Sequence, residues 1–146
     1  MKKHLEESGI SREILKDRSI LLAEDNDLNA EIAAVILERA GLKVERVEDG
    51  LQCISRITEM PAGTYDVILM DIQMPKMDGY KATQTIRNLS DQEKACIPII
   101  AMTANAFEED KRAAIAAGMN GHIAKPIQVD KLLSTLKTIL TENIIL

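Results

Sequence analysis

Acidic residues follow two apolar segments of the chain, where they could do chemistry together. Glu24 and Asp25 come directly after residues 20–23, and Asp71 comes directly after residues 67–70. Both segments are apolar without alternation, which is typical of strands covered on both faces. A carboxylate at the mouth of a buried strand is costly to hold, so we expect a cation beside it.

A hydroxyl group and an ammonium group come at corresponding places later in the chain. Thr103 and Ala104 follow residues 97–101, and Lys125 follows residues 121–124. If these strands are parallel, their carboxyl ends share one edge of a sheet, and the side chains converge there. Two unit charges about 4 Å apart repel by roughly 4 kcal/mol at an effective dielectric of about 20. Mg2+, which prefers oxygen ligands, and Lys125 would offset the repulsion among the acids.

A metal-held carboxylate that faces a hydroxyl and a lysine is suited to phosphoryl transfer. Asp71 would attack phosphorus in line and form an acyl phosphate. Mg2+ and Lys125 would neutralise the phosphoryl oxygens, and Thr103 would donate a hydrogen bond to one of them. Ala104 is small and would leave a path open to the site.

Strands and helices alternate along the 146 residues. We expect strands at residues 20–23, 43–47, 67–70, 97–101 and 121–124, and helices at about 27–41, 50–60, 80–89, 105–117 and 128–140. This order predicts an α/β fold, with an open, doubly wound, five-stranded parallel sheet and helices on both faces. An eightfold barrel would need many more residues.

Local signals mark the helices. Asn26 or Asp27 is expected to cap the first helix, and Asn105 with Glu108 resembles a capping box. The apolar face of the first helix is expected to consist of Leu28, Ile32, Val35 and Ile36. Acidic residues 108–110 are expected to form a solvated first turn of their helix.

Composition excludes several classes of protein. The net charge is −5 with scattered basic residues, and the chain has only three aromatic residues, so direct nucleic-acid binding is not expected. No apolar run approaches the roughly 20 residues that span a bilayer, and residues 1–9 lack the apolar core of a signal peptide. Cys53 and Cys96 lie among apolar residues and are expected to be buried free thiols, which with the missing signal peptide favours a cytoplasmic location.

Four segments of the chain resemble the signature segments of the receiver domain of two-component response regulators: LLAEDN, VILMDIQMPKMDG, PIIAMTANA and HIAKPI. They occur in the family's order, and the similarity covers about residues 18–142. Residues 1–17 would then be a linker or N-terminal extension, and residues 143–146 a C-terminal tail. The resemblance implies a flavodoxin-like sheet of order 2-1-3-4-5, and an Asp71 that accepts a phosphoryl group from a histidine kinase or a histidine phosphotransfer domain.

The resemblance also implies roles for the residues of the metal site. Asp25 would bind Mg2+ directly, together with Asp71, and Glu24 would bind mostly through water. Gln73 would offer its backbone carbonyl to the ion, so that its side chain matters less.

Further roles by resemblance concern the phosphoryl group and the switch. Thr103 matches the switch hydroxyl, and Ala104 and Lys125 match the positions that contact the phosphoryl group. The peptide bond between Lys125 and Pro126 is typically cis in the family. Where the family often has Tyr or Phe, this chain has His122, whose imidazole can be charged near neutral pH, so we expect the inward state of this side chain to depend on pH.

The resemblance leaves the parent protein open. The segments LLAEDNDLNAEIA and MTANAF favour the receiver of a hybrid histidine kinase over a stand-alone single-domain response regulator. The family uses the helices near 105–117 and 128–140 and the strand between them as its output face, through which a homodimer could form. No membrane contact is expected for this segment itself, and a parent chain could be membrane-anchored.

Two other functions are compatible with an acid after a buried strand. An aspartyl-phosphate phosphatase usually carries a second Asp two residues after its nucleophile, where this chain has Gln73. A flavodoxin-like nucleotide or flavin binder would show a phosphate-cradling loop after the first strand, and the acidic pair Glu24–Asp25 would repel phosphate there. We therefore predict a phosphoacceptor switch that assists only its own phosphorylation and dephosphorylation, not a conventional enzyme.

Overall fold

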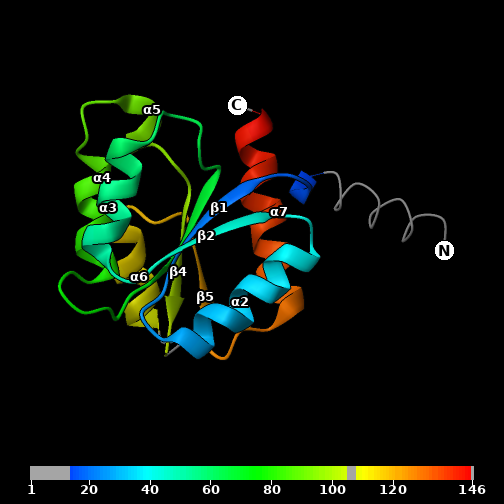
Figure 1. The fold of residues 1–146 in the computed structure, drawn as a ribbon. Coiled ribbons are helices and arrows are strands. Elements are labelled where there is room, and N and C mark those ends of the chain that lie inside the picture. The colour runs from blue at the N-terminus through cyan, green and yellow to red at the C-terminus, as the bar shows by residue number, and fades with distance from the viewer. Residues whose placement is uncertain (1–13, 105–107, 146) are drawn as a thin grey trace.

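The computed structural model describes residues 14–104 and 108–145 and shows a central sheet between two layers of helices (Figure 1). The strands are β1 (Ser19–Ala23), β2 (Lys43–Val47), β3 (Val67–Asp71), β4 (Ile99–Thr103) and β5 (Gly121–Ala124). The helices are α2 (Asp27–Arg39), α3 (Gly50–Glu59), α4 (Gly79–Arg87), α5 (Gln92–Ala95), α6 (Glu108–Ala117) and α7 (Val129–Ile145). None of these helices, within the described ranges, is both long enough and apolar enough to cross a bilayer.

The sheet has the order β2-β1-β3-β4-β5, and every neighbouring pair is parallel, as predicted. The register pairs Ala23 with Met70, and Asp71 with Met102. The carboxyl ends of β1, β3, β4 and β5 therefore lie at one edge of the sheet, which is where ligands bind in folds of this kind.

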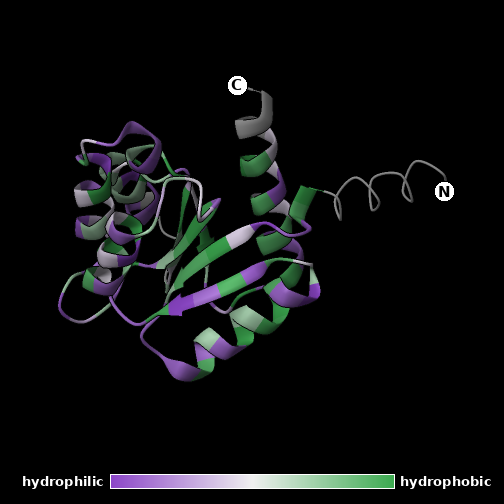
Figure 2. Cartoon of the chain, turned by 45° about the horizontal axis from the view of Figure 1, so that its top comes forward, coloured by the Kyte–Doolittle hydropathy of each residue, from purple (hydrophilic) through white to green (hydrophobic). Residues whose placement is uncertain are grey.

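Each face of the sheet carries its own apolar core. Ile20 and Leu22 of β1 pack with α2 and α7 on one face, whereas Leu21 and Ala23 pack with α3, α4 and α6 on the other. Alternate residues serve opposite faces because successive side chains of a strand point to opposite sides. Hydrophobic residues accordingly gather on the inner strands, and hydrophilic residues on the outer helices and loops (Figure 2).

Three sequence-based predictions about local structure were inaccurate. The fourth strand begins at Ile99 and not at residue 97, because Pro98 has no N–H to offer the ladder. The four-residue helix α5 was not predicted, since it is too short to show periodicity, although Asp91 caps it by accepting hydrogen bonds from Glu93 and Lys94. Cys53 is buried as expected, but Cys96 is exposed.

The buried face of α2 also differs from the expected one. Asn26 caps the helix as predicted, and its side chain accepts a hydrogen bond from the Asn29 amide. Among the bulky apolar residues of the helix, Leu28, Ile32 and Val35 are 64%, 45% and 43% exposed. The residues buried against the sheet are Ala30, Ala33 and Leu37. The two alanines let the helix approach β1 closely, which leaves a bulky apolar stripe in solvent. The predicted capping box at Asn105 lies outside the described residues.

Candidate functional site

Three carboxylates meet at the carboxyl edge of the sheet, as the sequence predicted. Glu24 and Asp25 follow β1, Asp71 ends β3, and one oxygen of each lies within 4.8 Å of the others. Glu24 is 1% exposed and Asp71 is 4% exposed, whereas Asp25 faces solvent. The cluster therefore has a buried floor and an open side through which a ligand can enter.

Lys125 joins the two buried acids. Its Nζ lies 2.9 Å from Oδ2 of Asp71, and 3.3 Å and 3.2 Å from Oε1 and Oε2 of Glu24. Lys125 follows β5 at the same edge, where its amide donates to the Thr103 carbonyl at 2.7 Å. The cis peptide bond before Pro126, implied by the family resemblance, is present. The ammonium group is thus shared between two acids that are 101 and 54 residues away in sequence.

Burial and mutual repulsion act on the protonation of this cluster. Burial raises the pKa of Glu24, and the neighbouring Asp71 raises it further, although Lys125 opposes both effects. Burial works to lower the pKa of Lys125, but the hydrogen bond to Asp71 and the charges of Asp71 and Glu24 outweigh it, so that this pKa is raised. Lys125 therefore stays charged, and the Glu24 carboxylate is held at a cost.

The cluster fits a hard divalent cation. Its three carboxylates face one ammonium group, which leaves two negative charges uncompensated when all are ionised. Oε2 of Glu24 is buried without a hydrogen-bond donor among the described residues, since its contact with Lys125 lacks hydrogen-bond geometry. This oxygen accepts no hydrogen bond from the described part of the chain and lies beside two other carboxylates. Mg2+ prefers oxygen ligands of this kind.

The remaining predicted residues lie around this cluster with different exposures. Thr103 is buried at the end of β4, and Ala104 is exposed directly after it. The Gln73 side chain is exposed, and the backbone N–H of Gln73 donates to Oδ1 of Asp71 at 3.2 Å. His122 lies on β5 opposite Ala101, two residues before the end of the strand. The structure thus brings Thr103, Ala104 and Gln73 to the acidic edge and places His122 deeper along the sheet.

Two glycines that sequence reasoning did not assign to the site keep the loop after Asp71 in place. A Cβ on Gly79 would lie 2.5 Å from the Asp71 carbonyl oxygen, and a Cβ on Gly50 would lie 2.6 Å from the Met77 carbonyl oxygen. No side chain fits at either distance, so only glycine allows α4 and α3 to begin so close to this loop. The Asp78–Gly79 dipeptide signalled a turn, and Asp78 caps α4.

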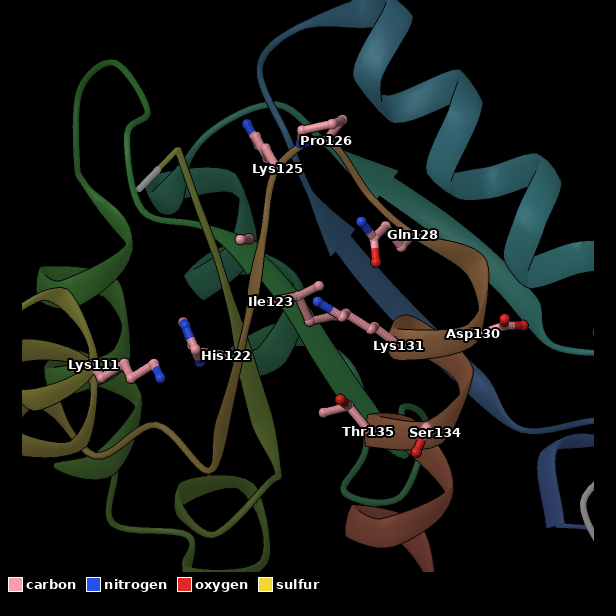
Figure 3. A pocket seen from close by; sticks show the side chains of 11 residues that line it. Lys111, His122, Ile123, Lys125, Pro126, Gln128, Asp130, Lys131, Ser134 and Thr135 are labelled. Carbon is pink, nitrogen blue, oxygen red and sulfur yellow. The ribbon is translucent and has the colours of Figure 1, made fainter. Parts of the chain in front are cut away.

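A cavity lies beside the acidic cluster and not at it. It has a volume of about 600 Å³ and is formed by α6, β5 and the start of α7 (Figure 3). Lys125 borders it, with Lys111, His122 and Lys131, but none of the three acids does. The same lysine that pairs with Asp71 is thus part of the wall of this groove.

Comparison with known proteins is consistent with this geometry. Residues 20–137 match the family model of the response regulator receiver domain. The chain is 39% identical over 115 residues to the peroxide stress-activated histidine kinase mak1 of Schizosaccharomyces pombe. The aligned region covers 78% of this chain but only 7% of that kinase.

Two solved structures are similar in fold. The receiver domain of sensor histidine kinase PA1611 from Pseudomonas aeruginosa, which holds a magnesium ion in its active-site cleft, is 37% identical, with a TM-score of 0.77 over 86% of this chain and 98% of that one. The receiver domain of Saccharomyces cerevisiae Ssk1, solved with the phosphotransfer protein Ypd1, is 26% identical, with a TM-score of 0.75 over 83% of this chain and 87% of that one.

The fold and the acidic edge define a phosphoacceptor module of the flavodoxin-like class. The chain belongs to the response regulator receiver domains of two-component phosphorelay signalling, and its relatives include the receiver regions of histidine kinases.

The raised pKa of Glu24 leads to a prediction about stability. Because the ionised side chain is held at a cost, Glu24→Gln should raise the unfolding midpoint at neutral pH in EDTA by about 2–4 °C, which corresponds to about 1 kcal/mol in a domain of this size. Wild type in EDTA should gain stability as the pH falls from neutral through the raised pKa towards 4.5, the ordinary value, whereas the variant should not.

The measurement is thermal unfolding followed by circular dichroism, with and without Mg2+. Added Mg2+ should stabilise wild type more than Glu24→Gln, since the variant lacks one carboxylate. Glu31→Gln is the control, because Glu31 is an exposed glutamate on α2, outside the acidic cluster. A Glu24→Gln variant that melts below wild type in EDTA at neutral pH would contradict this account.

Proposed function

We propose that this chain is a phosphoacceptor switch in which Asp71 receives a phosphoryl group from a phosphohistidine. The observation that carries the proposal is the 2.9 Å contact between Lys125 Nζ and Asp71 Oδ2, next to Glu24 and Asp25. We assign residues 18–142 to the receiver unit. Glu24, Asp25, Asp71 and the backbone carbonyl of Gln73 would hold Mg2+, which supplies positive charge to the phosphoryl oxygens when bound.

The protein groups that the transfer would use all lie at this edge of the sheet. A carboxylate oxygen of Asp71 forms a bond to phosphorus while the phosphorus–nitrogen bond of the donor breaks, and the electron pair of that bond stays on the imidazole nitrogen. Lys125, which already touches Asp71, would then contact a phosphoryl oxygen, together with the amide of Ala104 and the hydroxyl of Thr103. The Asp71–Lys125 contact therefore places the ammonium group before the reaction begins.

The proposed response to phosphorylation runs from Thr103 to the groove between α6, β5 and α7. As Thr103 moves to the phosphoryl group, the His122 side chain would turn inward. Figure 3 shows His122 on the side of β5 that faces Lys111, away from the α7 residues Ser134 and Thr135. An inward turn of His122 would reshape this face, which we propose as the output and homodimer surface.

We further propose that the chain is the receiver region of a hybrid histidine kinase at work in the cytoplasm. Its similarity to mak1, of which it spans 7%, supports this origin over a stand-alone regulator. Gln73 stands where an aspartyl-phosphate phosphatase needs its second acid, and this position disfavours turnover of small phosphate esters.

The acceptor assignment predicts a specific covalent product. Incubation with acetyl phosphate and Mg2+ should add one phosphoryl group to wild type, detected by intact mass spectrometry, and none to Asp71→Asn. Asp130→Asn should be labelled like wild type, because Asp130 is exposed at the start of α7. Labelling of Asp71→Asn at the wild-type level would refute the assignment.

The apolar stripe of α2, defined by Leu28, Ile32 and Val35, predicts where the donor protein binds. It is exposed and lies on the helix that follows Asp25 in the sequence, so we expect a donor that places its phosphohistidine over Asp71 to cover it. Ile32→Lys should slow phosphotransfer from a histidine phosphotransfer protein that labels wild type by about tenfold, since about 1.4 kcal/mol of apolar contact is lost.

Two comparisons isolate this effect. The rate with acetyl phosphate should not change in Ile32→Lys, because a small donor needs no docking surface. Ile115→Lys is the matched control, since Ile115 is exposed on α6 and gains the same charge. Equal slowing by both variants, or slowing with acetyl phosphate as well, would argue against this surface.

The histidine at the switch position predicts a pH-dependent response. The conformational change on phosphorylation, measured by NMR shifts of α6 and β5 amides, should be smaller at about pH 5.5 than at about pH 8, because a charged imidazole resists burial. His122→Tyr should remove this part of the pH dependence and leave any part that comes from Glu24. If the phosphorylation-induced change in wild type were the same at both pH values, the pH dependence assigned to His122 would be refuted.

A further inference from the structure

Arg46 on β2 holds the backbone of the acidic turn. Its Nε and one terminal nitrogen donate to the carbonyl oxygen of Glu24 at 2.9 Å and 2.8 Å. The other terminal nitrogen donates to Oδ1 of Asp27, the first residue of α2, at 2.8 Å. One guanidinium group therefore ties the end of β1 to the start of α2, on either side of Asp25.

Asn29 holds the same turn from the helix. Its amide donates to Oδ1 of Asn26 at 2.9 Å, which fixes the first turn of α2. Its side-chain amide donates to Oε1 of Glu24 at 3.3 Å. The other carboxylate oxygen of Glu24 is the buried one that lacks a hydrogen-bond donor among the described residues, so the hydrogen bond of Asn29 leaves that oxygen available.

The choice of acceptor atoms matters for metal binding. Arg46 bonds the main-chain oxygen of Glu24 and leaves the carboxylates of Glu24 and Asp25 without a guanidinium partner in these contacts. Asn29 is neutral and occupies one oxygen only. Both contacts add rigidity to a turn whose acids repel one another, and neither competes for the oxygens that a cation needs.

We propose that Arg46 and Asn29 are positioning residues that preorganise the Glu24–Asp25 turn for a divalent cation, an inference that rests on the proposed function. Charge alone predicts the opposite effect for Arg46. If the arginine acted only through its positive charge, its removal would tighten cation binding, because a repelling charge would be lost. Preorganisation requires that its removal weakens binding.

The test is direct cation binding, measured with Mn2+ by electron paramagnetic resonance and with Mg2+ by calorimetry. Arg46→Ala should raise the dissociation constant about tenfold, the lower end of effects for residues that orient metal ligands. Arg46→Lys should not restore it, because lysine keeps the charge but not the fork that grips one carbonyl oxygen twice. Asn29→Ala should also raise the dissociation constant. In a variant that already carries Glu24→Ala, adding Asn29→Ala should not change the dissociation constant further.

Arg56→Ala is the matched control. Arg56 makes a forked pair with Glu45 at 2.6 Å and 2.8 Å, beside the same strand, and its loss removes the same charge without touching the acidic turn. The dissociation constant of the Arg56→Ala variant for the cation should stay within about twofold of the wild-type value. Unfolding curves in EDTA confirm that each variant is folded, and Asn29→Ala carries the test if Arg46→Ala does not fold.

A second readout separates positioning from general damage. With acetyl phosphate as donor, Arg46→Ala should need about tenfold more Mg2+ for half-maximal labelling yet reach the wild-type rate at saturation. Binding that is unchanged or tighter in Arg46→Ala, or fully restored in Arg46→Lys, overturns the inference while wild type still binds and is labelled. A wild type that binds no cation overturns the proposed function as well.

Discussion

The ion pair between Lys125 and the two buried acids is the interaction on which the rest of the structure depends. Glu24 and Asp71 are almost fully buried within reach of one another, and each would be costly without a cation. One ammonium group 2.9 Å from Asp71 and 3.2 Å from Glu24 offsets part of that cost. What remains uncompensated is the negative charge that makes the edge a cation site.

A parallel sheet supplies this interaction at little cost in local structure. β1, β3 and β5 end at the same edge because all of their neighbours run in one direction. The three acids that meet there have trans peptide bonds, and the one cis bond among the described residues follows Lys125. The tight positions lie instead in the surrounding loops, where Gly79 and Gly50 let two helices begin against the loop that follows Asp71. The acidic cluster is therefore built at the ends of strands, and the two glycines allow the neighbouring helices to begin close to it.

The two sides of the acidic edge have different physical characters. On the side of α2, an exposed apolar stripe begins at Leu28, shortly after Asp25 in the sequence. On the side of α6, β5 and α7, a groove is bordered by Lys111, Lys131 and Lys125. Lys125 belongs to both the acidic cluster and the groove wall, so one side chain is common to the two features.

Much of the fold and of the site could be predicted from local patterns. Unbroken apolar runs indicated the buried strands, and the acids, the hydroxyl and the lysine that follow them indicated the site. Errors arose where a pattern had two solutions. The stripe of Leu28, Ile32 and Val35 was compatible with burial, but the alanines on the next face of α2 fit closer to β1. Cys96 lies between apolar neighbours and is nevertheless exposed, since α5 ends there.

The sequence by itself determined which chemical groups end which strands, because strand and helix periodicity are local properties of the chain. Only the tertiary structure decided how those groups are held. Arg46 and Asn29 both donate hydrogen bonds to Glu24, one from a neighbouring strand and one from the first turn of the following helix. The spacing of residues in the sequence does not predict either contact. Such contacts depend on which segments pack together and on the direction of each side chain, and both are set when the whole chain folds.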